Sequence, residues 1–295
     1  MKLRLDISIA TIFVLIWSTG FVIARLAMPY VEPATFLFWR FSGVLAAMAA
    51  MSLVWRMTWP SWSQAKHIAV AGVMLQFGYL LGVWFAVRLG MMAGLVAIIV
   101  GLQPILTAWF AAWISEKVSP RQWIGLVFGF AGVALVVAEK ISFTHIPFVS
   151  YLLAFIALLS ITFGTLYQKK YCPVFDLRAG SSIQFGVSAV LCFICMYLFE
   201  TGEMVWNASV TGALLWSIFP LSIGSISLLF MMIRRGAATK VTSFLYLVPP
   251  TTAVMAWILF REPFTVMMAL GLALTMTGVV LVNMGQVNTV PTIAE

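Results

Sequence analysis

The side chains in this chain that could do chemistry are carboxamides, hydroxyls and aromatic rings placed in apolar segments, several of them beside prolines. Such groups enclose a partly apolar solute and hydrogen-bond its polar atoms, so they favour solute binding over catalysis. Taken singly, each is better explained by helix packing, but together and beside the prolines they predict a substrate cavity. The candidate cavity residues are Trp17, Gln76, Tyr79, Gln103, Phe163, Tyr167, Ser243 and Tyr246.

Prolines recur in two apolar segments, "QPILTAWFAAWISEK" with Pro104 and "PPTTAVMAWILFREP" with Pro249 and Pro250. A proline inside a helix removes the hydrogen bond to the carbonyl four residues earlier. In lipid, such a carbonyl is tolerated where it faces protein or a water-filled cavity. We therefore expect both segments to kink beside the cavity, with ordinary packing kinks as the alternative.

Charged residues near these segments suggest capping and a vestibule. Glu116 and Glu262 each follow a proline by twelve residues and precede the next apolar run. They are expected to cap the helix that follows or, alternatively, to act as a gate. Arg25, Arg40 and Arg88 are expected at outer helix ends, where they line a vestibule for a carboxylate-bearing solute or extend their heads to the interface.

Catalytic and metal-binding patterns are missing from the sequence. It contains no HExxH motif and no pair of carboxylates within one apolar run, and Cys192 and Cys195 lie inside a continuous apolar stretch. The sequence therefore predicts no metal, no cofactor and no catalytic residues. An intramembrane enzyme stays as the alternative from a different class.

Composition places these residues in a membrane. Hydrophobic residues make up 63% of the 295-residue chain, charged residues 9%, and the mean hydropathy is +1.06. Soluble domains are about 45–50% apolar and about 25% charged. The chain is thus predicted to be an all-α polytopic membrane protein whose partners are the lipid bilayer and a small-molecule substrate. Its net charge of +8 is spread between apolar runs, so no nucleic acid partner is expected.

Ten apolar runs are long enough to approach the roughly 20 residues that a transmembrane helix needs. They cover residues 7–28, 34–55, 67–87, 91–114, 120–138, 147–168, 179–199, 211–233, 237–260 and 264–284. No ionisable residue falls at the centre of a run, which argues against a carboxylate proton relay.

Basic residues predict the orientation, because Lys and Arg accumulate in cytoplasmic loops. Twelve fall on the side of the N-terminus and five on the other side, the latter being Arg25, Arg40, Arg88, Lys140 and Arg261. Both termini are therefore expected in the cytoplasm.

An internal repeat relates the two halves. A shift of 146 positions aligns them without a gap over about fifty residues, and it pairs Gly90 with Gly236, Pro104 with Pro250, Glu116 with Glu262, Gly125 with Gly271 and Gly132 with Gly278. Each half would hold five helices, an odd number, so the second half would insert in the opposite direction. The predicted architecture is ten transmembrane helices as two inverted five-helix repeats, residues 1–140 and 147–285, followed by a tail, residues 286–295. Inverted repeats are typical of secondary transporters.

Two segments resemble the EamA family of the drug/metabolite transporter superfamily: "RLGMMAGLVAIIVGLQPILTAWFAAWISEKVS" and "RRGAATKVTSFLYLVPPTTAVMAWILFREPF", together with the opening "IWSTGFVIARL". The resemblance extends over nearly the whole chain. It implies a carrier that exports amino acids or related metabolites across the inner membrane by alternating access. Import of a planar aromatic nutrient such as riboflavin is the alternative. Glycines at 125, 129, 132, 271 and 278 predict close helix approach, within the chain or between two copies; the oligomeric state stays open.

Overall fold

The computed structural model describes residues 2–54, 57–114, 120–143, 146–172, 175–225, 227–228 and 247–284, and these are helical almost throughout. In chain order the helices are α1 (Lys2–Ala27), α2 (Pro33–Val54), α3 (Trp62–Gly72), η1 (Val73–Gly78), α4 (Tyr79–Arg88), α5 (Ala93–Val100), α6 (Gln103–Ile114), α7 (Pro120–Phe143), α8 (Phe148–Tyr171), α9 (Leu177–Phe199), α10 (Ala208–Trp216), η2 (Ser217–Gly224), α13 (Val248–Phe260) and α14 (Val266–Met284). The elements η1 and η2 are π-helical and continue α3 and α10.

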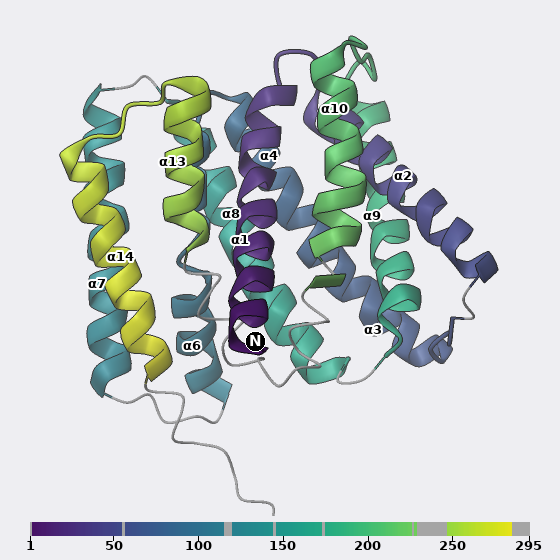
Figure 1. Ribbon diagram of the computed structural model, residues 1–295, viewed down its shortest axis with the longest axis horizontal. Coiled ribbons are helices and arrows are strands. Elements are labelled where there is room, and N and C mark those ends of the chain that lie inside the picture. Colours follow the sequence, from purple (N-terminus) through teal and green to yellow (C-terminus); the bar gives the residue numbers. More distant parts are fainter. Residues whose placement is uncertain are drawn as a thin grey trace, which may run out of the picture.

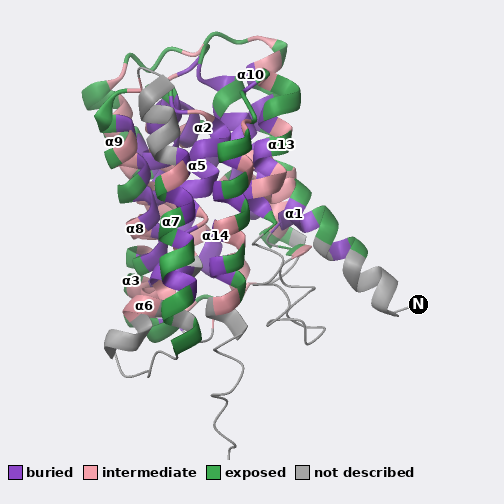
Figure 2. Cartoon of the chain, turned by 90° about the vertical axis from the view of Figure 1, so that its left-hand side faces the viewer, coloured by how far each residue is buried: buried purple, intermediate pink, exposed green. Residues whose placement is uncertain are grey.

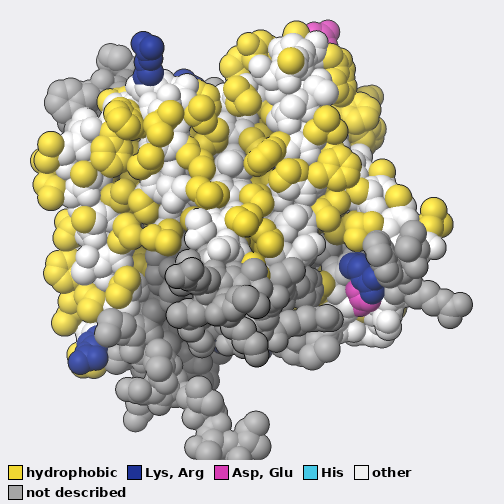
Figure 3. Space-filling model, in the orientation of Figure 1, with side chains coloured by type: hydrophobic (Ala, Val, Ile, Leu, Met, Phe, Trp, Pro, Cys, Tyr) yellow, Lys and Arg dark blue, Asp and Glu magenta, His cyan; other side chains and the backbone are white. Residues whose placement is uncertain are grey.

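The helices have the surface of a membrane protein. Among the described residues, four helices are individually long and apolar enough to cross a bilayer: Pro33–Leu53, Trp62–Arg88, Phe148–Tyr171 and Leu177–Phe199. Large apolar side chains point outward, and hydrophobic groups cover most of the described face in Figure 3. Buried residues face the middle of the bundle (Figure 2). These features are those of an all-helical, multi-pass membrane protein.

Helices from the two ends of the sequence alternate in space. In Figure 1, α1 runs up the front of the molecule between α13 and α10, both of which it contacts. α2 packs along α9, α4 packs along α8, and α7 packs along α14. The contacts of the π-helices are reciprocal, since η1 packs on α8 and α9 while η2 packs on α1 and α2.

Glycines bring α7 and α14 into backbone contact. A Cβ at Gly132 would lie 2.4 Å from the carbonyl oxygen of Gly271, and a Cβ at Gly278 would lie 2.4 Å from that of Gly125. Real Cβ atoms do not approach backbone this closely, so both positions require glycine. The close approach expected of these glycines therefore occurs within the chain, and we call this contact the glycine seam.

Candidate functional site

The segment around Pro104 is broken into two helices. α5 ends at Val100, Gly101 and Leu102 form a turn, and α6 begins at Gln103. Pro104 therefore occupies the first turn of α6, where no N–H is required for the helix. The break expected here is present, but it separates two helices instead of bending one.

The prolines of the later segment occupy the same kind of position. α13 begins at Val248, so Pro249 and Pro250 fall within its first turn. The residues before Leu247, including the candidates Ser243 and Tyr246, lie outside the described residues. Both proline motifs thus start a helix.

The two proline segments meet at the middle of the bundle. A Cβ at Gly101 would lie 2.7 Å from Cγ of Pro249, so a larger residue in the turn between α5 and α6 would require the start of α13 to shift. α5 is buried along its whole length. Gly101 is a site residue that the sequence reading missed, although its place before "LQP" could have indicated it.

Hydroxyl groups join α1 to the start of α13. Ser18 Oγ donates to the carbonyl of Val248 at 3.5 Å, and Thr252 Oγ1 donates to the carbonyl of Ser18 at 3.3 Å. Both side chains are fully buried. Ser18 was overlooked in favour of its neighbour Trp17, which is half-buried and packs on Phe13 with ring centroids 5.4 Å apart.

Serine hydroxyls also donate hydrogen bonds to backbone carbonyls within or next to the π-helices. Ser160 Oγ donates to the carbonyl of Met74 at 2.9 Å, and Ser188 Oγ donates to that of Gly72 at 3.2 Å. In η2, Ser222 Oγ donates to the carbonyl of Ser217 at 2.8 Å. π-turns leave carbonyls to be satisfied by side chains and occur often at functional sites.

The position of Arg40 corrects one expectation from the sequence. It is not at an outer helix end: it lies seven residues into α2, and only 5% of its surface is exposed. Its Nη2 and Nε donate to Ser222 Oγ at 3.1 and 3.4 Å. A cation is therefore buried inside an apolar run. The hydropathy pattern missed this because Arg40 stands close enough to Pro33 to resemble an interfacial residue.

The other candidate cavity residues separate into several environments. Gln103 Nε2 donates to Thr165 Oγ1 at 3.0 Å and so links α6 to α8. Tyr167 joins His67, whose Nδ1 lies 2.8 Å from the tyrosine hydroxyl, while Phe163 is 42% exposed and packs on Phe110. Gln76 lies within η1, half-buried. Within the described residues, no ring contact joins Trp17, Phe163 and Tyr167.

Glu262 caps a helix, but not the one that follows it. Its carboxylate accepts from the backbone N–H groups of Ala93 and Gly94 at 3.1 and 3.4 Å, at the start of α5. Its side chain is buried. Negative charge is favourable at a helix N-terminus, and here the helix is 169 residues away in sequence. Glu116 lies outside the described residues.

Hydrogen bonds join distant parts of the chain at the end of the bundle where α1 finishes, which we call the Ala27 end. Glu200 accepts from the N–H groups of Ala34 and Thr35 at 2.8 and 2.7 Å, and Glu32 accepts from the N–H of Thr201 at 2.7 Å. These bonds tie the start of α2 to the segment that follows α9.

The vestibule candidates Arg25 and Arg88 lie at this same Ala27 end. Both are exposed, and Arg88 Nη1 donates to the carbonyl of Met28. Arg88 therefore connects the end of α4 to the end of α1.

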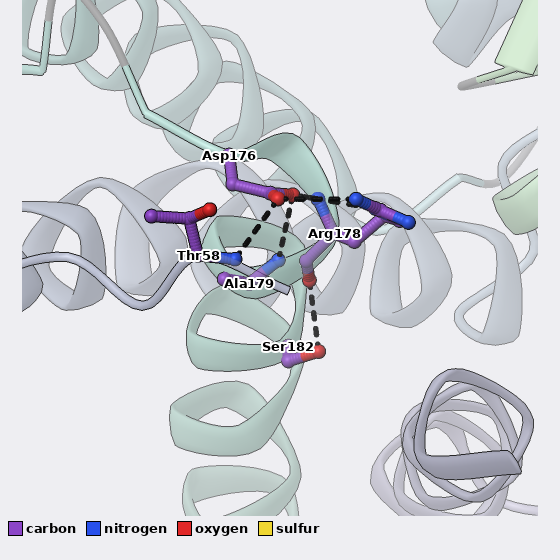
Figure 4. A network of polar contacts seen from close by, with 5 residues as sticks. All are labelled: Thr58, Asp176, Arg178, Ala179 and Ser182. Atoms are coloured by element: carbon purple, nitrogen blue, oxygen red, sulfur yellow. Dashed lines mark hydrogen bonds and ion pairs between the residues drawn. The ribbon is translucent and has the colours of Figure 1, made fainter. Parts of the chain in front are cut away.

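At the opposite end, which we call the Thr58 end, Asp176 organises the start of α9 (Figure 4). Its carboxylate accepts from the backbone N–H of Thr58 at 3.2 Å and pairs with Arg178 at 3.2 Å. Partial burial alone raises the pKa of Asp176, but the hydrogen bonds from Thr58, Arg178 and Ala179 outweigh it and hold the pKa below the usual value. The beginning of α9 is thus linked to the segment after α2.

Fold and side-chain contacts together define a class of protein: a multi-pass helical bundle with broken helices and π-turns, and with buried hydroxyl groups and a buried arginine among its described residues. Within the described residues, no three metal-ligating side chains lie together. Such an arrangement suits the binding of a small solute inside the membrane.

The family follows from comparison with known sequences. The profile of the EamA-like transporter family matches the chain twice, over residues 5–138 and residues 148–284. The chain belongs to this family, and the resemblance noted from its motifs is confirmed. It is a membrane transport protein.

Relatives and one structure extend this result. "Uncharacterized transporter YvbV" of Bacillus subtilis (strain 168) is 29% identical over 279 residues, which cover 92% of this chain and 88% of that protein. "Probable amino-acid metabolite efflux pump" of Salmonella typhimurium (strain LT2) is 23% identical over 288 residues, 93% of each chain. A crystal structure of a protein with 18% identity has a TM-score of 0.66 and covers 97% of this chain and 99% of that one, so the fold is shared.

Proposed function

We propose that this protein is a secondary transporter that moves amino acids or related small metabolites outward across the inner membrane by alternating access. In this proposal ten transmembrane helices form two inverted repeats, residues 1–140 and 147–285, with residues 286–295 as a tail. Both termini lie in the cytoplasm, so the Ala27 end faces outward. Export and amino-acid metabolites are supported by the name of the relatives called probable amino-acid metabolite efflux pumps.

The observation that carries the proposal is the reciprocity of the contacts. Gly132 touches Gly271 while Gly125 touches Gly278, and the repeat offset of 146 relates Gly125 to Gly271 and Gly132 to Gly278. A contact between i and j that recurs with the partners exchanged is what a two-fold relation produces. The π-helices follow the same rule, because η1 ends at Gly78 and η2 ends at Gly224, again 146 positions apart. Two equivalent halves around a central site can expose it to either side in turn.

The hydrogen bonds at the two ends support a mechanism for this exchange. Opening the Ala27 end requires Glu200 to release the start of α2 and Glu32 to release Thr201. Opening the Thr58 end requires Asp176 to release Thr58. These bonds bridge polar groups near the bundle ends, where water can replace each partner, so each can break at small net cost.

Uptake of a planar aromatic nutrient has weaker support. That alternative depended on an enclosure formed by aromatic side chains, and Phe163 and Tyr167 are engaged with Phe110 and His67 instead. The candidate groups that make polar contacts in the described residues include hydroxyls, the Gln103 carboxamide and Arg40. They suit a small polar metabolite better than a large flat ring.

Counterflow in proteoliposomes tests the proposal. Vesicles that contain the purified protein and are loaded with one metabolite should accumulate the labelled form of that metabolite, and empty vesicles should not. A panel of amino acids, amines, sugars and nucleosides covers the solute classes. Absence of counterflow with every member would contradict carrier function.

Variants then test the site. Replacement of Trp17, Gln103 or Tyr246 by alanine should abolish counterflow while the protein still elutes as a single folded species. Normal flux in all three variants would show that the solute binds elsewhere.

A further inference from the structure

Arg40 is the one buried cation for which the described contacts supply no acid. It follows Pro33 by seven residues, which places it about 10 Å along α2 from the start of the helix. Its side chain is 5% exposed. Burial of an ion at this depth is unfavourable unless a partner compensates the charge, so the position calls for an explanation.

The described carboxylates that make hydrogen bonds make them elsewhere. Glu262 is bound to the start of α5, Glu200 to the start of α2, and Glu32 to Thr201. The ion pair within the described part of the chain is Arg178–Asp176, at the Thr58 end. Among the described residues, therefore, no acid neutralises Arg40.

The described hydrogen-bond partner of Arg40 is a hydroxyl group. Ser222 accepts from its Nη2 and Nε and is itself held in place by donating to the carbonyl of Ser217. In the described contacts Nη1 has no hydrogen-bond acceptor, so one side of the planar guanidinium is left for another group.

Close packing brings the second half of the chain to this point. A Cβ at Gly43, one turn further along α2, would lie 2.3 Å from Cδ1 of Ile218 in η2. Arg40 is therefore located where α2 meets η2, and Ser222 belongs to that same π-helix. A ligand held by Arg40 would contact both halves at once.

We propose that Arg40 binds the carboxylate of the transported solute, with the hydroxyl of Ser222 completing the site. Arginine pairs with a planar carboxylate through two parallel hydrogen bonds, a geometry that a lysine does not reproduce. The solute would supply the negative charge that the described residues lack. It would also compete with Ser222 for the guanidinium and so change how η2 packs on α2. This inference rests on the proposed function and narrows its substrate to monocarboxylates.

Competition between related solutes in the wild-type protein tests whether the carboxylate of the solute is recognised. Counterflow is measured with each common L-amino acid, and the amino acid with the highest rate is selected. Uptake of its labelled form is then measured in the presence of the same amino acid without label, of its amide, or of its methyl ester. The acid should inhibit at least about tenfold more strongly than either neutral derivative, because the charge-assisted pair is lost in both. Equal inhibition overturns the inference. Counterflow of sugars, amines or nucleosides without any amino acid overturns it too, yet leaves carrier function intact.

Substitution of Arg40 tests the role of this residue in solute binding. Arg40→Gln should raise the half-saturating concentration of the acid at least about tenfold and remove the preference for the acid over the amide. Arg121→Gln, at an exposed position on α7, is the matched loss of a positive charge and should leave both unchanged. An unchanged preference in a folded Arg40→Gln protein overturns the inference.

A purely structural role predicts a different outcome. If Arg40 only fastened η2 to α2, its substitution would lower the amount of active protein without altering acid-to-amide preference. If Arg40→Gln does not fold, Arg40→Lys decides, because it keeps the charge and removes the two parallel bonds. An increase in the half-saturating concentration for the acid but not for the amide supports the proposal, and kinetics identical to wild type overturn it.

Discussion

Two contacts between early and late parts of the chain differ in what holds them together. At the glycine seam, backbone meets backbone between α7 and α14, and each approach leaves no room for a Cβ. Around α2 and η2, a buried arginine and serines connect the helices through side-chain hydrogen bonds. Backbone contacts of the first kind depend on fixed shape, whereas hydrogen bonds of the second kind can be exchanged for others. We therefore expect the seam to stay fixed as the centre rearranges during transport.

The largest effect is expected from breaking the seam. Gly132→Ala places a Cβ 2.4 Å from the carbonyl oxygen of Gly271, and backbone on both helices prevents relief. Overpacking of this kind destabilises by about 1–3 kcal/mol or more, and we expect the upper part of that range. Thermal unfolding of the purified protein in detergent, followed by tryptophan fluorescence, measures the change.

Gly212→Ala on α10 is the control for the seam, because its Cβ would meet nothing within 4 Å. Its stability should equal that of the wild type or slightly exceed it, since alanine favours the helix. If Gly132→Ala and Gly212→Ala unfold at the same temperature, the seam is not a fixed contact.

A smaller effect is expected where the two proline segments meet. Gly101→Ala places a Cβ 2.7 Å from Cγ of Pro249, a contact with a side-chain ring that a small shift of α13 can relieve. We expect a destabilisation of about 1–2 kcal/mol, with a larger proportional loss of counterflow because the turn adjoins the central site. Gly186→Ala, whose Cβ would lie 4.0 Å from Leu45, is the control. Loss of stability without loss of flux would show that this turn, like the glycine seam, is a fixed contact that does not rearrange during transport.

Helix positions and proline breaks were predictable because both depend on local sequence. Apolar run length predicts α2, α8 and α9 within a few residues, and the missing N–H of Pro104 predicts the break that precedes it. The glycines of the seam could be identified as close-contact positions, although only the structure places them within one chain. These features need no knowledge of distant partners.

The remaining features depend on partners far away in sequence. Arg40 looks interfacial by its distance from Pro33, and only the packing of η2 on α2 buries it. Glu262 stands before its own next helix, which suggested local capping, yet it caps α5 across 169 positions. The π-helices carry a weak signal, namely glycines at 78 and 224 that the repeat offset relates. A search for pairs at that offset would have identified them.

Glu262 is a third kind of contact between early and late parts of the chain, because its charged carboxylate caps the buried helix α5 at the Ala27 end. Glu262→Gln keeps the shape but removes the negative charge from the start of α5, so we expect a destabilisation of about 1 kcal/mol. Glu203→Gln, an exposed acid near the same end, should have no effect. The difference in unfolding temperature between the two variants measures the capping charge. Equal temperatures would show that the backbone bonds to Ala93 and Gly94 do not depend on charge.

The smallest effect is expected at the Thr58 end, where Asp176 caps α9 close to water. The pKa of its carboxyl is held below the usual value, so the folded protein binds a proton there less readily than the unfolded chain does. The resulting stabilisation is fully present above the ordinary aspartate pKa of about 4 and disappears as the pH falls through the folded-state pKa. Asp176→Asn retains a capping oxygen and removes the charge, which should lower stability by about 0.5 kcal/mol at neutral pH. Unfolding measured from pH 8 down to pH 3 should show the wild-type advantage constant above about pH 5 and decreasing as the pH falls below the ordinary aspartate pKa. An advantage that does not change over this range would mean that shape, and not charge, links α9 to Thr58, as at the glycine seam.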